Sequence, residues 1–254
     1  MLILLPPSEG KTEPAGDEPL ALDSLVFARH LTPQRERLIG ALEKLGERPL
    51  KKAIQVMEIS EGLSGDISRN AGIMTAPAGP ASEVYTGVLY DRLGFASLGK
   101  RAAGRAGGNV LIASGLWGML RPDDRIPYYR LSMKPKLARI GGLAAYWRQP
   151  LATAMRDSGF DEPGEIVLDM RSGPYVSAWK PKQAKLVAVR AFTESGGKRK
   201  VISHMAKAVR GDVARLVLSA PSIPKDADGV AEVLAAAGLR IEVSADSIDV
   251  IETA

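Results

Sequence analysis

The sequence predicts a mixed α/β protein whose central mixed sheet is flanked by helices. Short apolar runs, typical of buried strands, occur at 2–5 and 110–113, and the runs at 165–170 and 186–192 are mainly apolar. Longer stretches between them space their apolar residues along one face of a helix. None of the 254 residues form a linker long enough to separate two units, so we expect one domain over residues 1–254.

Composition excludes several classes of site. Cysteine is absent, so disulfides, thiolate nucleophiles and cysteine-held metal or iron–sulfur centres are impossible. The first apolar run stops after five residues and no basic region accompanies it, which favours a strand over a signal peptide. No run approaches the roughly 18 apolar residues of a membrane helix. We therefore expect a cytoplasmic protein with no membrane partner.

Positive charge is concentrated in two parts of the chain. Segments 100–148 and 180–215 each contain ten lysines or arginines against two acids, so the remainder is acidic although the whole chain is +5. Such asymmetry favours a basic surface that faces a polyanion or an anionic ligand. The alternative is that these charges are dispersed around the fold and solvated.

The first strand ends at a polar loop. Leu5 is followed by Pro-Pro-Ser-Glu-Gly-Lys-Thr over residues 6–12. The Gly-Lys-Thr ending is similar to that of a P-loop, but the first glycine of the motif is missing, so we reject a Walker site. Ser8, Lys11 and backbone N–H groups can still bind an anion here. An ordinary strand-exit loop with a solvated lysine is the alternative.

Residues 31–75 predict a helical insertion within the domain. Thr32 fits an N-cap with Pro33 at the first helical position, and a second helix is expected from about Pro49. A glycine-bearing break at 61–65 then precedes a further helix. This outline is typical of a helix-hairpin-helix unit, which presents backbone N–H groups to nucleic-acid phosphates. It is also the outline of a common packing unit.

Residues 114–133 follow the strand at 110–113 and combine glycines, prolines, arginines and aromatics. A loop ordered by proline and rich in arginine, just past a strand end, is where α/β proteins place binding groups. The alternative is a packed connector whose arginines pair with Asp123 and Asp124. The Ala/Gly/Arg-rich piece before the strand, 100–108, is expected to be a flexible approach.

The second half of the chain continues the alternation of helices and strands. Residues 140–155 have one apolar face, although Pro150 is expected to kink or interrupt that helix. The other expected elements are a strand at 165–170, a polar loop at 171–175, a hairpin through 196–198, a helix at 231–237 and closing strands at 240–243 and 247–251.

An amphipathic helix is expected between about Ser203 and Leu218. Lys207 and Arg210 fall on the side opposite its apolar stripe, so both can reach one anion. The alternative is a solvated helix face.

The strand-exit loops suggest one cleft. If the strands at 2–5, 110–113 and 165–170 are parallel neighbours, the loops that follow them converge at one edge of the sheet. A cleft there would be positive and suited to phosphate through bidentate arginine contacts. The candidate anion- or DNA-binding residues are Ser8, Lys11, Ser114, Arg121, Arg125, Tyr129, Arg130, Tyr175, Lys207 and Arg210.

Groups for catalysis or metal binding are scarce. His30 and His204 are the only histidines, and neither stands near a cluster of acids with ligand spacing. We therefore expect no metal site and no cofactor. No histidine is placed by a motif to activate a serine nucleophile, so no catalytic residue is assigned.

Residues 114–133 closely resemble the signature of the YaaA family of bacterial peroxide-stress proteins, also called UPF0246 or DUF328. The other matching segments are 1–12, 84–87, Tyr146-Trp147 and 201–211, and the match extends to about Ile223. Departures are Trp117, where the family usually has Tyr, and Val209, where it usually has Lys.

The resemblance implies an unusual mixed α/β, YaaA-like fold that holds a helix-hairpin-helix motif. It implies a peroxide-stress protein that binds double-stranded DNA in a positive cleft and limits iron-dependent oxidative damage. The alternative is an enzyme acting on a small phosphorylated or nucleotide-like molecule, a small anionic ligand, in the same cleft. An open groove with spread charge would favour DNA, whereas a closed pocket with converging Ser, Lys and Arg would favour the enzyme.

Overall fold

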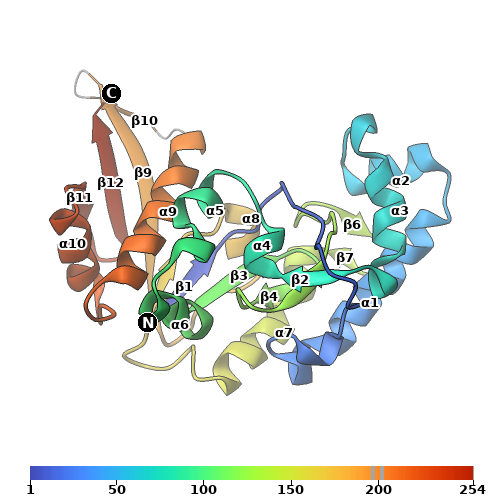
Figure 1. The fold of residues 1–254 in the computed structure, drawn as a ribbon, viewed down its shortest axis with the longest axis horizontal. Coiled ribbons are helices and arrows are strands. Elements are labelled where there is room, and N and C mark those ends of the chain that lie inside the picture. Colours follow the sequence, from blue (N-terminus) through green and yellow to red (C-terminus); the bar gives the residue numbers. More distant parts are fainter. Residues whose placement is uncertain (196–197, 201–202, 254) are drawn as a thin grey trace.

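Eight strands form one mixed sheet within the residues that the computed structural model describes, 1–195, 198–200 and 203–253 (Figure 1). Their order is β11-β12-β9-β8-β1-β3-β4, with β10 beside β9. The parallel strands are β1 Leu2–Leu5, β3 Val110–Ser114, β8 Ile166–Asp169, β9 Lys185–Ser195 and β12 Ser247–Thr253. The antiparallel strands are β4 Gly118–Leu120, β10 Lys198–Lys200 and β11 Arg240–Val243. The predicted mixed α/β class is confirmed.

Helices flank this sheet in two groups (Figure 1). The group at one end is α1 Ala28–Gly46, α2 Leu50–Met57, α3 Gly65–Ala71 and α7 Leu143–Asp157. The other helices are α4 Ala81–Val84, α5 Val88–Leu93, α6 Lys100–Asn109, α8 Gly173–Val176, α9 Ser203–Ser219 and α10 Ala227–Ala236. Two small ladders join β2 Ala78–Pro80 to β5 Arg125–Pro127 and β6 Lys136–Leu137 to β7 Gly141–Gly142.

The first strand lies near the middle of the sheet. β1 pairs in parallel with β3 on one side and with β8 on the other. All four of its residues are buried, as expected for a strand covered on both faces. Because β1 is central, the polar loop that follows Leu5 begins at the centre of the sheet's carboxyl edge.

The predicted start of the first helix is wrong. α1 begins at Ala28, after Phe27 in the left-handed backbone conformation (φ 58°), and Pro33 lies inside the helix. The Thr32 hydroxyl does not cap a helix but faces Asp23 at 3.4 Å. The first helical turn starts earlier because the N–H of Leu31 donates to the carbonyl of Phe27 at 2.9 Å.

The flexible segment predicted at 100–108 is instead the helix α6. Ala102 and Ala106 lie about one turn apart and are both buried against the core. Arg105 fixes the helix by donating to the carbonyls of Leu218 (3.1 Å) and Pro221 (2.9 Å). Tertiary contacts thus override the low helix propensity of the three glycines in α6.

The interruption predicted at Pro150 is absent, because α7 runs continuously from Leu143 to Asp157. Its apolar face, which includes Leu143, Trp147 and Leu151, is fully buried. That packing outweighs the one backbone donor that a proline removes. Trp147 is a core residue whose indole N–H donates to the carbonyl of Gly115 at 2.8 Å.

Two other predictions concern short connections. The helices expected after Pro49 are present as α2 and α3, joined by residues 58–64. Their use as a nucleic-acid-binding hairpin stays a prediction. β9 and β10 pair antiparallel as the predicted hairpin requires, and residues 196–197, which join them, lie outside the described residues.

The packing of α9 against α5 gives a first testable prediction. A Cβ atom on Gly211 would lie 2.7 Å from the Cβ of Arg92 and closer still to the carbonyl oxygen of Leu89. Because backbone atoms cannot move aside cheaply, Gly211→Ala should lower the free energy of unfolding by about 3 kcal/mol. Urea denaturation followed by circular dichroism measures the change.

The matched control is Gly104→Ala in α6, where a Cβ meets nothing within 4 Å. That variant should be stabilised by up to about 1 kcal/mol, because alanine has the higher helix propensity. Equal stability of Gly211→Ala and the wild type would contradict the close approach of the two helices.

Candidate functional site

Polar loops meet at the carboxyl edge of the central parallel strands. β8, β1 and β3 are neighbours that run in the same direction, so the chain leaves each of them at the same edge. The predicted convergence of residues 6–12 with 171–175 and with the end of β3 is therefore confirmed. This edge is where ligands bind in many open α/β sheets.

A cleft of about 390 Å³ opens at this edge. It is lined by Pro6, Pro7, Ser8, Glu9, Gly10, Thr86, Gly87, Val88, Leu89, Tyr90, Ser172, Tyr175, Lys207 and Arg210. Helix α9 contributes the two cations, and the loop after β1 contributes the single carboxylate. The structure thus brings together four predicted site residues, Ser8, Tyr175, Lys207 and Arg210.

Arg210 has an unsatisfied donor in the cleft. Its Nε is buried and makes no hydrogen bond to the residues that the structure describes. Burial lowers the pKa of Arg210, an effect that the charge of Asp169 partly offsets. A guanidinium stays protonated in proteins, so Arg210 is a half-buried cation with free donor capacity. Lys207, three residues earlier on the same helix, is exposed.

The loop after β1 is held against residues 84–87. The Ser8 hydroxyl donates to the carbonyl of Thr86, and the N–H of Thr86 donates to the carbonyl of Gly10 at 3.2 Å. A side chain on Gly10 would meet the hydroxyl of Thr86, and Gly87 has φ 98°. Backbone conformation therefore favours glycine at position 87, whereas at position 10 a side chain would have to displace the hydroxyl of Thr86.

Lys11 lies beneath this loop rather than in the cleft lining. Its ammonium donates to the carbonyl of Ser8 at 2.7 Å and sits 4.7 Å from the ring centre of Tyr129 and 5.4 Å from that of Tyr85. Burial lowers the pKa of Lys11 to about 8, although the nearby charge of Glu9 acts in the opposite direction. The amine of Lys11 therefore lies beside the cleft with a lowered pKa, and one carbonyl and two aromatic faces hold it in place.

A chain of buried hydroxyl groups supports Lys11 from below. The Tyr129 hydroxyl lies 2.7 Å from those of both Tyr85 and Ser114. Ser114 also accepts hydrogen bonds from the N–H groups of Leu116 (3.2 Å) and Trp117 (3.0 Å). Burial raises the pKa of Tyr85 and of Tyr129 well above the usual value. Ser114 and Tyr129 therefore shape the floor of the site and do not reach the cleft.

Arg130 is neutralised within the protein. Its Nε pairs with Asp66 of α3, and its guanidinium also lies 3.3 Å from the carboxylate of Glu9. The backbone of Arg130 exchanges two hydrogen bonds with the side chain of Asn70, at 2.7 and 2.9 Å. Arg130 thus ties α3 to the strand-exit loop and has little capacity left for an external phosphate.

The expectation that Arg121 and Arg125 join the cleft is wrong. The turn at 115–117 reverses the chain into β4, which runs antiparallel to β3 and delivers Arg121 to the opposite edge of the sheet. Arg125 lies in the β2–β5 ladder, where it pairs with Glu18 at 3.0 Å. Neither residue lines the cleft.

Sequence reasoning missed several residues of the site. Tyr85 gave no chemical signal beyond the Thr-Gly pair after it, which marks the turn at Gly87. Glu9 lies between the candidates Ser8 and Lys11 and was not itself a candidate. Asp66 lies in a helix whose sequence contains no motif. Residues such as Asp66 could be found only through the tertiary contact with Arg130.

Comparison with known proteins identifies the family. The family model described as peroxide stress protein YaaA matches residues 1–239. The chain belongs to this family. A UPF0246 protein of Streptomyces coelicolor is 42% identical over 96% of this chain and 93% of its own length. A UPF0246 protein of Corynebacterium glutamicum is 35% identical over 95% of each chain, and an uncharacterized protein of Campylobacter jejuni is 31% identical over 83% and 82%.

The segments that resemble the YaaA family meet in space. Residues 1–12 lie beside residues 84–87, Ser114 lies beneath both, and α9 forms the facing wall. Stretches separated by about 200 residues of chain thus build one site. Four of the segments that carry the family resemblance thus contribute to the cleft or to its floor, while Tyr146 and Trp147 lie in helix α7 away from it.

The described part of the chain holds neither a metal-binding cluster nor a membrane-spanning helix. No group of three or more His, Asp or Glu side chains there is placed to hold a metal ion, and no helix there is long and apolar enough to cross a membrane. His30 lies 3.0 Å from Asp157 at the surface, while the side chain of His204 lies outside the described residues. That the protein uses no metal or cofactor stays a prediction.

The environment of Lys11 gives a second testable prediction. The pKa of Lys11 is about 8 in the folded protein, whereas that of an exposed lysine is about 10.4. Between these values the unfolded chain binds more protons, so this group makes stability rise with pH. Between the two pKa values, the slope of the free energy of unfolding against pH approaches about 1.4 kcal/mol per pH unit. The slope falls to zero below the folded pKa, where Lys11 is protonated in both the folded and the unfolded state. Lys11→Met should remove it.

Urea denaturation at intervals from about pH 7 to about pH 9.5 measures this difference between the wild type and Lys11→Met. Lys51→Met, at an exposed lysine of α2, is the control and should keep the wild-type slope. Parallel pH profiles for Lys11→Met and the wild type would mean that Lys11 has an ordinary pKa.

Proposed function

We propose that this member of the peroxide-stress family binds double-stranded DNA across its concave face and so limits iron-dependent oxidative damage. A duplex covered by protein is less accessible to radicals formed from ferrous iron and peroxide. This role places the protein in the cytoplasm, where bacterial DNA lies.

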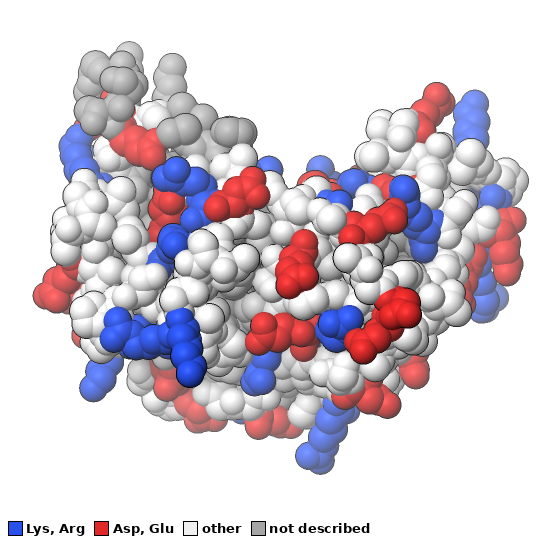
Figure 2. All heavy atoms as spheres, in the orientation of Figure 1, with Lys and Arg blue, Asp and Glu red and all other residues white. Residues whose placement is uncertain are grey.

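The observation that carries the proposal is a trough along the concave face. The cleft beside α9 adjoins a second hollow of about 340 Å³, because Glu9 lines both. The second hollow extends from Arg130 and Lys134 to Glu58 and Ser60, in the connection between α2 and α3. Figure 2 shows this face hollowed between the end formed by α2 and α3 and the end formed by β9 and α9. An elongated, open hollow favours an extended ligand over a compact one.

The helix pair at one end of the trough supports the same proposal. The connection of α2 and α3 faces the second hollow through Ser60 and Leu63. A glycine-bearing connection of this kind can present backbone N–H groups to a phosphate. The ion pair of Arg130 with Asp66 holds α3 in place against the trough.

The number of unpaired cations in the trough sets the number of DNA phosphates that the protein is expected to contact. Lys207, Arg210 and Lys134 line the trough and make no ion pair with the described residues, whereas Arg130 is already paired. Acidic and basic side chains are also interspersed over the side of the molecule that Figure 2 turns to the viewer, where the trough is seen only in profile. We therefore expect about three phosphate contacts, fewer than the two basic segments of the sequence suggest.

The enzyme reading remains a second candidate because of Arg210. A half-buried guanidinium without a partner among the described residues, in a cleft that Ser8 and Tyr175 also line, suits the phosphate of one small molecule. Under this alternative the substrate is a small phosphorylated or nucleotide-like compound, and the amine of Lys11 lies nearby as a candidate base.

A salt titration of duplex binding tests the DNA proposal. Each phosphate neutralised in B-DNA changes the slope of log affinity against log salt by about −0.9, so three contacts give about −3. Lys207→Ala and Lys134→Ala should each make the slope shallower by roughly 0.9, equally for unrelated DNA sequences, because phosphate contacts hold no base information. Fluorescence anisotropy with labelled duplexes measures the slopes.

Arg121→Ala is the matched control, since it removes one exposed cation from the opposite edge of the sheet. Its slope should equal that of the wild type, and thermal melts should show that all variants are folded. A duplex affinity that does not change with salt would contradict the DNA proposal. Weak duplex binding, together with tight binding of a small phosphorylated compound that Arg210→Ala abolishes, would support the enzyme hypothesis instead. A plasmid-nicking assay with ferrous iron and peroxide then tests the protective effect.

A further inference from the structure

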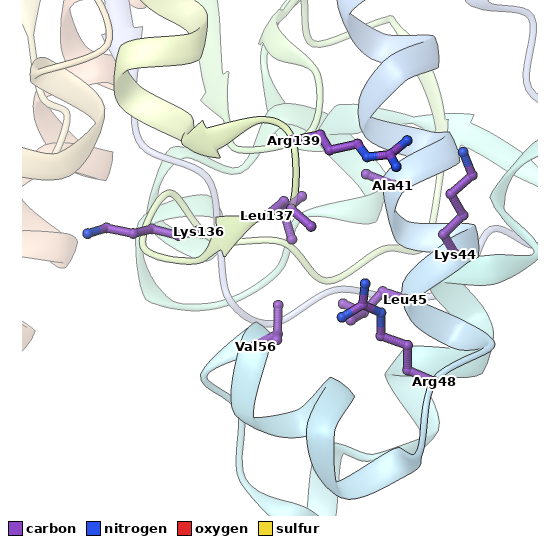
Figure 3. A pocket seen from close by; sticks show the side chains of 9 residues that line it. Ala41, Lys44, Leu45, Arg48, Val56, Lys136, Leu137 and Arg139 are labelled. Atoms are coloured by element: carbon purple, nitrogen blue, oxygen red, sulfur yellow. The ribbon is translucent and has the colours of Figure 1, made fainter.

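A second basic pocket lies away from the trough. It holds about 510 Å³ and is formed by the end of α1, by α2 and by the turn between β6 and β7 (Figure 3). Its floor is aliphatic, with Leu45 and Leu137 buried and Val56 half-buried. Its rim contains four cations, Lys44, Arg48, Lys136 and Arg139, and no carboxylate is among the lining residues.

The rim cations are not neutralised by the protein. Among the described residues, the side chains of Lys44, Arg48, Lys136 and Arg139 make no ion pair or hydrogen bond. Most other arginines described above are paired with a carboxylate or donate to backbone carbonyls. Like charges gathered around one cavity repel each other unless an anion lies between them. All four side chains are exposed, so their donors are available to an external anion.

The orientations of the four cationic side chains show which of them face the pocket. In Figure 3 the guanidinium of Arg139 extends toward Ala41 and Lys44, the side chain of Arg48 lies beside Leu45, and Lys136 points away. Arg139 stands in the turn between Leu137 and Gly141 with φ 63°, a conformation that residues other than glycine rarely adopt. The turn thus holds an arginine at a strained position beside the pocket, where a glycine would fit the backbone better.

The cationic rim and the aliphatic floor of the pocket together indicate the class of ligand. Guanidinium groups bind phosphate through a planar fork and also stack on the faces of nucleic-acid bases. Aliphatic side chains on the floor favour a ligand that also has a weakly polar body. A DNA duplex exposes phosphates, sugars and base edges but keeps the base faces stacked, so it offers no base face to the apolar floor. A nucleotide whose base is unpaired satisfies both parts of the pocket.

We propose that this pocket binds a single nucleoside phosphate unit, with its phosphate between Arg48, Arg139 and Lys44 and its base against Leu45, Val56 and Leu137. The unit is either a free nucleotide or an unpaired nucleotide of a DNA strand, since both present the same chemistry. The pocket is separate from the trough, so the inference does not depend on duplex binding there.

The test measures binding of three probes to the full-length protein: deoxyadenosine monophosphate, a short labelled single strand, and inorganic phosphate. Arg139→Gly removes the guanidinium and suits the positive φ, so this variant should fold at least as well as the wild type. Arg48→Ala removes the second guanidinium. Each should weaken nucleotide or single-strand binding on the order of tenfold or more, because charge-assisted hydrogen bonds are lost. Lys51→Ala, at an exposed cation of α2 that does not line the pocket, should bind as the wild type does.

Each outcome decides the matter. Binding of the free nucleotide, of the single strand, or of both, with the expected loss in Arg139→Gly and Arg48→Ala, supports the pocket and shows which source it uses. Inorganic phosphate bound as tightly as the nucleotide would overturn the nucleoside assignment. No binding, or variants equal to the wild type, would overturn the site. The duplex salt slope of Arg139→Gly should equal that of the wild type, so failure of duplex binding and failure of this pocket are distinguishable.

Discussion

The hydroxyl of Ser114 is the contact on which the edge of the sheet depends. It accepts the N–H groups of Leu116 and Trp117, which closes the turn at the end of β3, and it touches the hydroxyl of Tyr129. The closed turn sends the next residues back across the sheet as β4, while the contact with Tyr129 returns a later part of the same loop to the carboxyl edge. Tyr129 then supports Lys11, and Lys11 holds the loop after β1 through the carbonyl of Ser8. One buried oxygen thus supports the floor of the candidate site and the loop wall that faces α9.

Much of the positive charge has a structural use. Arg35 is fully buried and donates to the carbonyls of Val26, Trp117 and Met119, and its burial lowers its pKa to about 10. Arg105 and Arg215 satisfy carbonyl groups at the ends of neighbouring segments. Removing one of these guanidinium groups would leave buried acceptors without donors, a cost that surface cations do not have. These arginines are therefore not available to a ligand, whereas cations that make no ion pair with the described residues line the trough and the pocket beside α1.

The strands could be predicted because short, mainly apolar runs have few other uses in a soluble chain. Their order could not be predicted, and the parallel centre was only the condition on which the expected cleft depended. Lys207 and Arg210 were placed correctly on one side of α9 for the same kind of reason, helical periodicity. The path after Ser114 could not be predicted, since a three-residue reversal with Gly115 and Gly118 looks like any loop in sequence. The helix α6 and the role of Asp66 depend on partners far along the chain, which no local pattern contains.

The central position of β1 has a consequence for how the chain is made. Ile3 pairs with Val110 and Leu2 pairs with Val167, so β1 waits for partners that are synthesised more than a hundred residues later. At about 5–20 residues per second, its second neighbour leaves the ribosome roughly 10–30 seconds later. Contacts of such long range make folding slow, and the sheet cannot close while synthesis is incomplete. An unpaired apolar strand of this kind is a natural substrate for chaperones during that interval.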